Sequence, residues 1–600
     1  MINPPKLGIF IDLPLIHEPK PSLAEVVRLA KTINREAGLA LLGKMNLALS
    51  VAALDDELND GTNSRLPRVQ QMLIRDTISR RRLVQIKSAL GHRSPSDCVV
   101  FHRRQVLAAI RLVALFGRSA GGNRLESRDD LDVVADLALA VNSLNEFEAI
   151  PSGSAAVRSL APQLAPEREI TNPPRINNAL VRTRRMLGRF LQDHLSVPIA
   201  RDLERLFVFL TNGFSFEAFQ DLMFGTFAYF QSLPLDDLST FQKAAFLNPY
   251  APGNVLSGSL FETFLAHTAA DPYELPGLLN PVTDERNLLL DFITFRALPV
   301  WRYTPEHYLC IDALFLVEKL ASGFYWAVNK ALDTDARRHS FSSLWGTLFE
   351  DHVRDILRYA IPPESGRLIE APFYLAPQEE AFDAVVLEGT HAIVFEIKGL
   401  FARAEAKYSG LFEPFFRGLS QKFGNQPGGA IQQLAKNIRL TFGLPRRREL
   451  PGLPVRELRC VWPVVVVLEP ILGLGLASRL LVERFQHRLR EFIPQQYTTV
   501  RPVVFLQVDD LETIAEHARA GDFSLVDCLR EKLGTDPEHL HSFHDFYWGQ
   551  FVPERRLRFR RNEAIATEYK QLTEAALERF RNGEYKGCVT TAYGTVFPRH

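Results

Sequence analysis

The chain lacks several features that would assign it at once to a familiar class. It has only five cysteines in 600 residues, scattered and without a CxxC pair, which argues against a disulfide framework or a zinc ribbon and favours a reducing compartment. Its 70 lysines and arginines balance 70 aspartates and glutamates, so neither a histone-like polycation nor an acidic tail protein fits. A neutral total still permits nucleic-acid binding, because a basic surface can be offset elsewhere in the chain.

Long apolar runs and targeting signals are missing too. The most apolar segment, residues 461–482, is interrupted by Pro463, Glu469, Pro470 and Arg479, so it predicts two buried elements and not a membrane span. The N-terminal segment has prolines and acids where a signal peptide needs a basic stretch followed by apolar residues. We therefore expect a cytoplasmic protein with no membrane association.

Motifs of several enzyme classes are also absent. The sequence contains no Walker A pattern, GxSxG elbow or HExxH motif, which removes the usual signs of a nucleotide motor, a serine hydrolase or a zinc protease. No repeat with a period of about 20–50 residues is visible, so no solenoid is expected. At 46% hydrophobic and 23% charged residues, the chain has the composition of a globular protein of several domains.

The chain before residue 340 has the periodicity of helices. Apolar residues recur at helical spacing in segments separated by loops rich in Gly, Pro, Asn and Ser, at 66–90, 101–117, 128–147, 176–212 and 215–231. Ser22 and Glu25 predict a capping box at the start of another helix. We expect residues 1–340 to be a mainly helical region that recognises a substrate or partner, or regulates the rest of the chain.

After residue 340 the pattern becomes that of a mixed α/β domain. In order along the chain, we expect a helix over 341–359, strands over 367–375, 381–387 and 391–397, a helix over 430–442, a strand over 461–468, a helix over 474–492, a strand over 502–508 and a helix from Asp509. This order predicts a domain over 341–530 with one central mixed sheet. Residues 531–600 are expected to be mainly helical.

The strand pair over residues 381–397 carries the chemically informative residues. Side chains alternate along a strand, so Glu396 and Lys398 project to one face while Ile393, Phe395 and Ile397 fill the other. A hairpin brings Asp383 to the same end of the sheet. Two carboxylates can hold Mg²⁺, which prefers oxygen ligands. An ammonium beside them can position or deprotonate a water molecule and stabilise charge on a phosphate.

Two further polar side chains lie on predicted helices. Glu350 is on the apolar face of its helix, where a carboxylate is costly unless a metal or a bound water pairs with it. Gln433 lies one turn into the helix after a Gly-rich segment, and it is placed to supply an amide to the same site. Gln432 and Lys436 are rivals for that role. The Gly-rich segment, residues 424–429, is expected to be a loop near the site.

This arrangement resembles the PD-(D/E)XK nuclease superfamily, which has the restriction-endonuclease-like fold. The residues that carry the resemblance are Asp383, the Glu396-x-Lys398 pair, Glu350 and Gln433. The match covers about residues 340–520, roughly a third of the chain. Phe382 stands where the family pattern has proline, a position that contributes no ligand.

The resemblance implies Mg²⁺-dependent hydrolysis of a phosphodiester bond, with Mn²⁺ as a substitute. Asp383 and Glu396 would bind the metal, and Lys398 would activate water. Glu350 and Gln433 would assist. The resemblance favours an endonuclease over an exonuclease, DNA over RNA, and a role in prokaryotic defence against phage or foreign DNA, as a homo-oligomer or with a defence-system partner protein. The alternative is a nucleic-acid-binding or scaffold protein whose nuclease-like module is catalytically silent.

Clusters of basic residues are candidates for phosphate contacts, although a solvated face explains each of them as well. Arg446, Arg447 and Arg448 follow the helix that bears Gln433. Arg558 and Arg560 would lie on one face of a strand over residues 556–560. A similar cluster contains Arg182, Arg184 and Arg185.

Two other polar clusters have plain structural interpretations. His539, His541, His544 and Asp545 offer metal ligands, but the aromatic residues around them favour a packed patch. Asp509 and Asp510 are typical of a helix N-cap and a first-turn acid.

Overall fold

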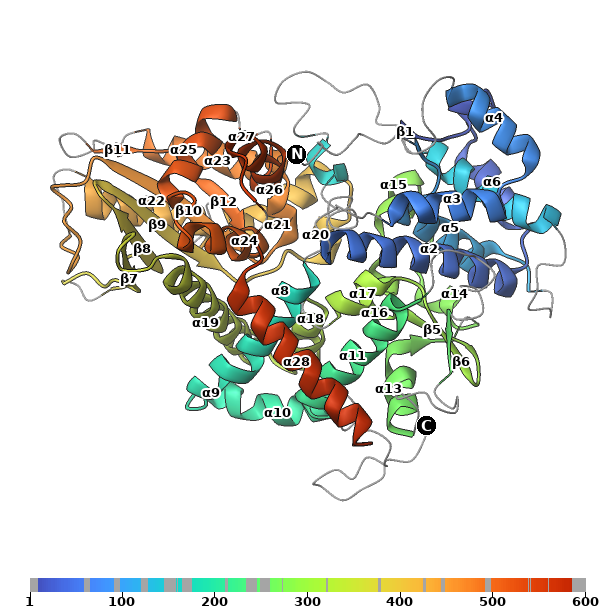
Figure 1. Cartoon of the computed structure of the whole chain (residues 1–600), viewed down its shortest axis with the longest axis horizontal. Coiled ribbons are helices and arrows are strands. Elements are labelled where there is room, and N and C mark those ends of the chain that lie inside the picture. The colour runs from blue at the N-terminus through green and yellow to red at the C-terminus, as the bar shows by residue number, and fades with distance from the viewer. Residues whose placement is uncertain are drawn as a thin grey trace. The chain divides into compact units, whose positions relative to one another are not determined.

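The computed structural model describes most of the chain. The described residues are 9–58, 65–90, 98–119, 128–144, 158, 160–164, 175–210, 214–233, 245–248, 259–271, 273–319, 322–375, 379–424, 428–443, 448–490, 498–537, 539, 541–558 and 560–584. The chain forms two compact units (Figure 1). Unit 1 consists of Met1–Ile2, Ile150–Arg201 and Asp333–Glu568, and unit 2 of Asn3–Ala149, Asp202–Leu332 and Tyr569–His600.

The boundaries of these units differ from the segments expected from the sequence, which are 1–340, 341–530 and 531–600. The α/β part begins at Asp333, close to the expected change of pattern. However, Ile150–Arg201 from the helical region also belongs to unit 1, as do the residues of the C-terminal segment up to Glu568. Unit 1 is therefore assembled from segments far apart in the chain.

Unit 2 is mainly helical. Its helices are η1 (Pro14–Ile16), α1 (Leu23–Ala30), α2 (Arg35–Leu58), α3 (Leu66–Thr77), α4 (Arg80–Leu90), α5 (Arg103–Phe116), α6 (Arg128–Ser143), α11 (Phe216–Gln231), α13 (Ser259–Thr268), α14 (Leu275–Leu278), α15 (Glu285–Leu290), α16 (Ile293–Ala297), α17 (Ala313–Glu318) and α18 (Ser322–Ala331). The predicted capping box is confirmed, since Ser22 accepts from the Glu25 N–H and Glu25 accepts from the Ser22 N–H.

The longest helix of unit 2, α2, forms part of its core. Within the described chain, α2 alone has a stretch, Arg35–Ala53, that is long and apolar enough to cross a membrane. In the structure 89% of that stretch is buried inside the protein, as in the core helix of a globular unit.

Unit 2 also contains strands that the sequence analysis missed. A four-stranded mixed sheet has the order β3 (Phe246–Leu247), β6 (His307–Cys310), β5 (Val300–Thr304) and β4 (Ala269–Ala270). A parallel pair joins β1 (Ile9–Phe10) and β2 (Cys98–Val99). Strands of two to five residues show too little alternation of apolar and polar side chains to be distinguished from loops.

Two of the predicted helices are interrupted. The segment 66–90 forms α3 and α4. The segment 176–212 forms α8 (Ile176–Arg184), a π-helix η3 (Arg185–Phe190), α9 (Leu191–Asp193) and, after a turn, α10 (Pro198–Leu210). Pro198 explains this second break, because proline suits the first position of a helix but not its interior.

Unit 1 is built on a six-stranded mixed sheet, as predicted for its α/β part. The strands are β7 (Arg367–Glu370), β8 (Ala384–Glu388), β9 (His391–Lys398), β10 (Cys460–Val467), β11 (Thr499–Val500) and β12 (Val504–Gln507). Their order is β11-β10-β9-β8-β7, and β12 also pairs with β10. The strands β7, β8 and β9 are antiparallel, whereas β9, β10, β11 and β12 are parallel. Every residue of β10 is buried, as expected for a strand covered on both faces.

Helices cover both faces of this sheet. They are α19 (Asp335–Ala360), α20 (Ala404–Lys407), α21 (Phe412–Lys422), α22 (Ala430–Phe442), η4 (Pro470–Gly473), α23 (Gly475–Leu489), α24 (Val508–Arg519), α25 (Leu525–Thr535), α26 (Phe543–Phe546), η5 (Tyr547–Phe551) and α27 (Val552–Arg555), while α28 (Glu563–Arg581) begins in unit 1. Val385 and Val394 pack in one core with Ile431 and Leu434 of α22. On the other face, side chains of α24 and α25 lie against β9.

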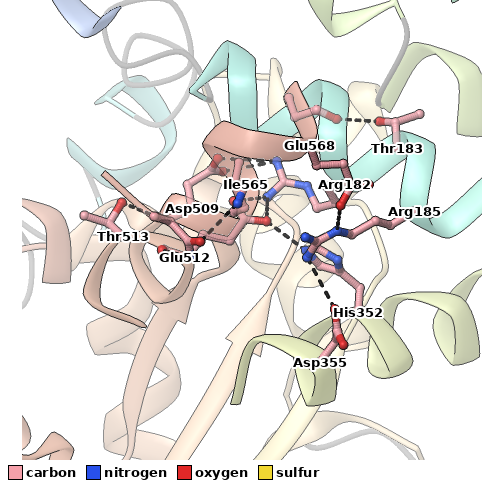
Figure 2. Close-up of polar contacts among 12 residues, drawn as sticks. Arg182, Thr183, Arg185, His352, Asp355, Asp509, Glu512, Thr513, Ile565 and Glu568 are labelled. Atoms are coloured by element: carbon pink, nitrogen blue, oxygen red, sulfur yellow. Dashed lines mark hydrogen bonds and ion pairs between the residues drawn. The ribbon is translucent and has the colours of Figure 1, made fainter. Parts of the chain in front are cut away.

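A buried cluster of charged residues connects the helices of unit 1 (Figure 2). Arg182 of α8 lies 3.3 Å from Asp509 and 3.2 Å from Glu512, both on α24. His352 of α19 contacts Glu512 at 2.8 Å, and both of their side chains are fully buried. Arg185 joins the cluster through Glu568 of α28 at 2.8 Å. Because Arg182 and Arg185 are committed to these contacts, they are not free for phosphate.

Asp509 and Asp510 occupy the first turn of α24, and the N-cap is Gln507 rather than an aspartate. The first-turn position was predicted, but the role of Asp509 as a partner of Arg182 was not. Burial raises the pKa of Asp509 to about 6, and the Arg182 guanidinium opposes that shift. The segment that forms α8 thus supplies the counter-charge for an acid more than 300 residues later in the chain.

Replacing Arg182 with alanine is expected to destabilise the protein by about 3–5 kcal/mol, because the substitution leaves Glu512 buried without its cation. Urea unfolding followed by circular dichroism measures this loss. The control is Arg189→Ala, since Arg189 is 53% exposed and pairs with Asp355 at 2.8 Å. Such a surface pair contributes about 0–1 kcal/mol. Equal losses in the two variants would contradict the importance of the buried cluster.

Candidate functional site

Asp383 lies just before β8 and is held against β9, the strand that carries Glu396. The Asp383 N–H, just before β8, donates to the Phe395 carbonyl of β9 at 3.1 Å. The antiparallel register of β8 and β9 ends with Ala384 opposite Phe395, so the bond from Asp383 to Phe395 departs from that register by one residue, as in a β-bulge. Besides burial, Asp383 raises the pKa of Glu396, as a nearby carboxylate does. The two carboxylates therefore meet at one end of the sheet.

Lys398, at the end of β9, completes a compact group with these acids. Its Nζ atom lies 2.6 Å from Glu396 Oε1, and only 16% of the lysine side chain and 4% of the glutamate side chain are exposed. The Asp383 carboxylate accepts a hydrogen bond from the Ile397 N–H at 2.5 Å. Each of these groups is thus held by a specific partner on β9.

Glu350 approaches the same group from α19. Burial raises the pKa of Glu350 to about 8, and repulsion by the Asp383 carboxylate adds to the shift. The pKa of Glu396 is also raised to about 8, by burial first and then by Asp383. Burial raises the pKa of Asp383 as well, although Lys398 opposes this shift. These mutual effects show that the acids interact and that cations only partly offset their repulsion.

Lys398 remains a cation in this setting. Burial by itself lowers the pKa of Lys398, but attraction by Glu396 and Asp383 outweighs burial, and the net shift is upward. The arrangement therefore combines a persistent ammonium with carboxylates that exchange protons near neutral pH.

Arg354 and Glu380 belong to the site, and the sequence analysis missed both. The Arg354 guanidinium donates to the Asp383 carbonyl at 3.1 Å and lies 3.1 Å from the Glu350 carboxylate. It also lies 3.6 Å from Glu380. The i, i+4 spacing of Glu350 and Arg354 was visible as a helix pair. Glu380 carried no such signal, because it reaches the site only through the chain bend before β8.

Gln433 lies on α22, which packs on the sheet face that bears Glu396. One turn further along the same helix face, Asn437 donates to the Ala381 carbonyl, two residues before Asp383. Gln433 Oε1 is buried and has no hydrogen-bond partner within the described part of the chain.

The rivals of Gln433 differ from it. Lys436 is 55% exposed and pairs with Glu379 at 2.7 Å, so it is engaged at the surface. Gln432 has polar or ring contacts of its own. In the Gly-rich segment, Gly428 has a positive φ of 83° just before α22 begins, and residues 425–427 lie outside the described part.

Of the five arginines predicted to contact phosphate in the C-terminal half of the chain, two pair with acids in the structure. Arg446 and Arg447 lie outside the described residues. Arg448 lies 2.6 Å from Glu379. The strand predicted over 556–560 is wrong for its described residues, because Arg556 adopts a left-handed conformation that ends α27. Arg560 pairs with Asp522 at 2.7 Å, and Arg558 is exposed in the loop.

The histidines near residue 540 do not converge on one point. His541 lies 3.6 Å from Asp536, whereas His544 lies 3.3 Å from Asp510. Across the described residues, no group of three or more His, Cys, Asp or Glu side chains is arranged to hold a metal ion as it stands. At the sheet end this agrees with the ion pairs that Glu396 and Glu350 make with Lys398 and Arg354.

Comparison with protein-family models, with curated proteins and with solved structures found no match in any of the three. The functional argument therefore depends on the residues of this chain and on their geometry.

The raised pKa of Glu350 predicts a particular dependence of stability on pH. Folded protein binds more protons than unfolded protein between about pH 4.5 and 8, so the stabilising contribution is present at acid pH and is lost as the pH rises through about 8. Glu350→Gln should remove this loss. Between pH 5 and 8, we expect the free energy of unfolding to fall less in the variant than in the wild type, by at least about 1 kcal/mol.

Glu379 provides the matched control. Hydrogen bonds from Lys436 and Arg448 hold the pKa of Glu379 at about 2, so this carboxylate is ionised above pH 5 in both folded and unfolded protein. Its stabilising contribution is lost only in more acidic solution. Glu379→Gln should therefore leave the slope between pH 5 and 8 unchanged, and a Glu350→Gln profile parallel to the wild type would refute the raised pKa.

Proposed function

We propose that this protein is a divalent-metal-dependent nuclease whose α/β unit has the restriction-endonuclease-like fold. The observation that carries the proposal is the Asp383 carboxylate held by the Ile397 N–H at 2.5 Å, between Glu396 and Lys398 on the same strand. Glu350 and Arg354 reach the same sheet end from α19. Two neighbouring acids, with a lysine at the end of an apolar strand, form the arrangement that the PD-(D/E)XK resemblance requires.

The donor atoms suit Mg²⁺ or Mn²⁺. Asp383 and Glu396 offer carboxylate oxygens near each other, and Gln433 of α22 offers a buried oxygen that has no hydrogen-bond partner among the described residues. Because a carboxylate has two oxygens, Glu396 can bind a cation through its second oxygen while Oε1 keeps its 2.6 Å contact with Lys398. When bound, the cation supplies positive charge that activates water and stabilises charge on the phosphate.

Lys398 and Glu350 have different proposed roles in hydrolysis. The Lys398 ammonium is placed to orient the attacking water and to stabilise negative charge on the phosphate. Glu350, with a pKa raised to about 8, can take up a proton near neutral pH. In the reaction a bond forms between the water oxygen and phosphorus, the bond from phosphorus to the leaving oxygen breaks, and that oxygen acquires a proton.

The biological setting follows from the resemblance alone. We propose DNA in preference to RNA as substrate, endonucleolytic cleavage, and a role in prokaryotic defence, either as a homo-oligomer or with a partner protein. A catalytically silent nucleic-acid-binding module is the alternative, and the occupied ion pairs of Glu396 and Glu350 are the observation in its favour.

Lys398→Ala should abolish metal-dependent cleavage. General acid–base assistance contributes typically 10²–10⁴-fold, so the rate is expected to fall by about that factor. Asp383→Ala should fail in a different way, by weakening the metal site. A higher concentration of Mg²⁺ or Mn²⁺ should then restore part of the activity of Asp383→Ala, whereas it should restore none of the activity of Lys398→Ala. The measurement is cleavage of plasmid, single-stranded DNA and RNA with Mg²⁺, Mn²⁺ or a chelator.

Lys330→Ala is the matched control, because Lys330 is an exposed lysine on α18 of unit 2. It should cleave like the wild type. Full activity in Lys398→Ala and Asp383→Ala, or no cleavage by the wild type with either metal, would refute the proposed function.

A further inference from the structure

A short antiparallel ladder precedes β8 and borders the candidate site. Phe373 pairs with Glu380 in a β-bridge, the Tyr374 N–H donates to the Glu379 carbonyl at 2.9 Å, and the Ala381 N–H donates to the Pro372 carbonyl at 2.8 Å. Alternation along the ladder places Phe373 and Glu380 on one face. Tyr374 lies on the opposite face, where its hydroxyl contacts Thr441 of α22.

The face with Phe373 is open to solvent, and beside Glu380 it carries two exposed apolar side chains. Phe373 is 47% exposed and Leu375 is 62% exposed, whereas Tyr374 between them is 1% exposed. A single exposed apolar residue is ordinary. Here, however, Phe373 and Leu375 are two residues apart, so their side chains lie on the same face of the ladder. This face is next to the group of acids.

Arg354 connects this face to the acids of the site. Its guanidinium lies 3.6 Å from Glu380, the bridge partner of Phe373, and 3.1 Å from Glu350. The same guanidinium donates to the Asp383 carbonyl at 3.1 Å. The face with Phe373 is therefore continuous with the sheet end that carries Asp383 and Glu396.

Positive charge lies on the other side of the same ladder. Glu379 is shared by Lys436 at 2.7 Å and Arg448 at 2.6 Å, so two cations face one acid. Proteins that bind single-stranded nucleic acid combine such positive charge, which follows the phosphates, with aromatic rings on which bases stack.

We infer that Phe373 is a stacking platform for an unpaired base of the strand that enters the site, so that the preferred substrate is single-stranded or locally unpaired nucleic acid. This inference rests on the proposed function and extends it to a substrate class. A base inside a duplex is stacked on both sides, and its face is not available to a protein ring. Leu375 extends the apolar contact, and the charge on Lys436 and Arg448 favours the phosphates.

The test uses Lys398→Ala as background, so that bound strands are not cut. Fluorescence anisotropy measures, with Mg²⁺ present, the dissociation constants for labelled oligothymidylate of about 16 nucleotides, for the matching oligouridylate and for a blunt duplex. Adding Phe373→Ala should weaken single-strand binding about tenfold, within the range for the loss of one stacked base. Phe373→Trp should restore it. Tyr273→Ala, which removes an aromatic side chain that is 64% exposed in unit 2, should have no effect.

The outcomes separate the platform from the proposed reaction. Equal single-strand affinity with and without Phe373, tighter binding of the duplex than of the single strands, or no binding of any of the three probes would overturn the platform. The proposed function fails separately, through absence of metal-dependent cleavage by the wild type, whatever Phe373 contributes to binding. Comparison of the two single-stranded probes shows whether the platform serves DNA, RNA or both.

Discussion

The candidate site depends on the antiparallel register between β8 and β9. Because Ala384 pairs with Phe395, Asp383 lies where β8 begins, and its carboxylate accepts from the Ile397 N–H between Glu396 and Lys398. A shift of the register by one residue would move Asp383 away from Ile397 and turn the buried side chains of β8 to the opposite face. The register is held by the burial of alternating residues on both strands, so the packing of the core also determines the spacing of the two acids.

The acids of the site repel one another, and nearby cations partly offset this repulsion. Glu396 and Glu350 have raised pKa values because they are buried near Asp383, and Lys398 and Arg354 supply the nearest positive charges. A cluster of buried acids contributes little to stability, since each acid favours its protonated form. Such an arrangement is typical of functional sites, where groups are held in protonation states suited to chemistry.

The second cluster of charges serves a different purpose. Arg182, His352 and Glu512 are buried and contact one another, and they join α8, α19 and α24. Residues two apart on a helix point in nearly opposite directions, so α19 directs Glu350 to the site and His352 to this cluster. One helix thereby connects the position of an acid at the site to the packing of a segment from the N-terminal half of the chain.

Local pattern in the sequence determined the elements of the α/β unit. The helix over 430–442 and the strands over 391–397 and 461–468 were predicted to within a residue or so, because apolar periodicity and turn residues act between near neighbours. The same alternation predicted that Glu396 and Lys398 share a face. By contrast, the short strands of unit 2 and the assignment of Ile150–Arg201 to unit 1 were not predictable.

Only the tertiary structure decided which partners the charged residues take. Arg182 and Arg185 looked like a surface cluster, yet acids distant in sequence bury them. Arg354 and Glu380 carry no motif, and they join the site because α19 crosses the end of the sheet and the chain bends before β8. The physical reason is that alternation and helical period report the direction of a side chain from its own backbone. Which group it meets depends on how distant segments pack, and a single sequence contains no local signal of that packing.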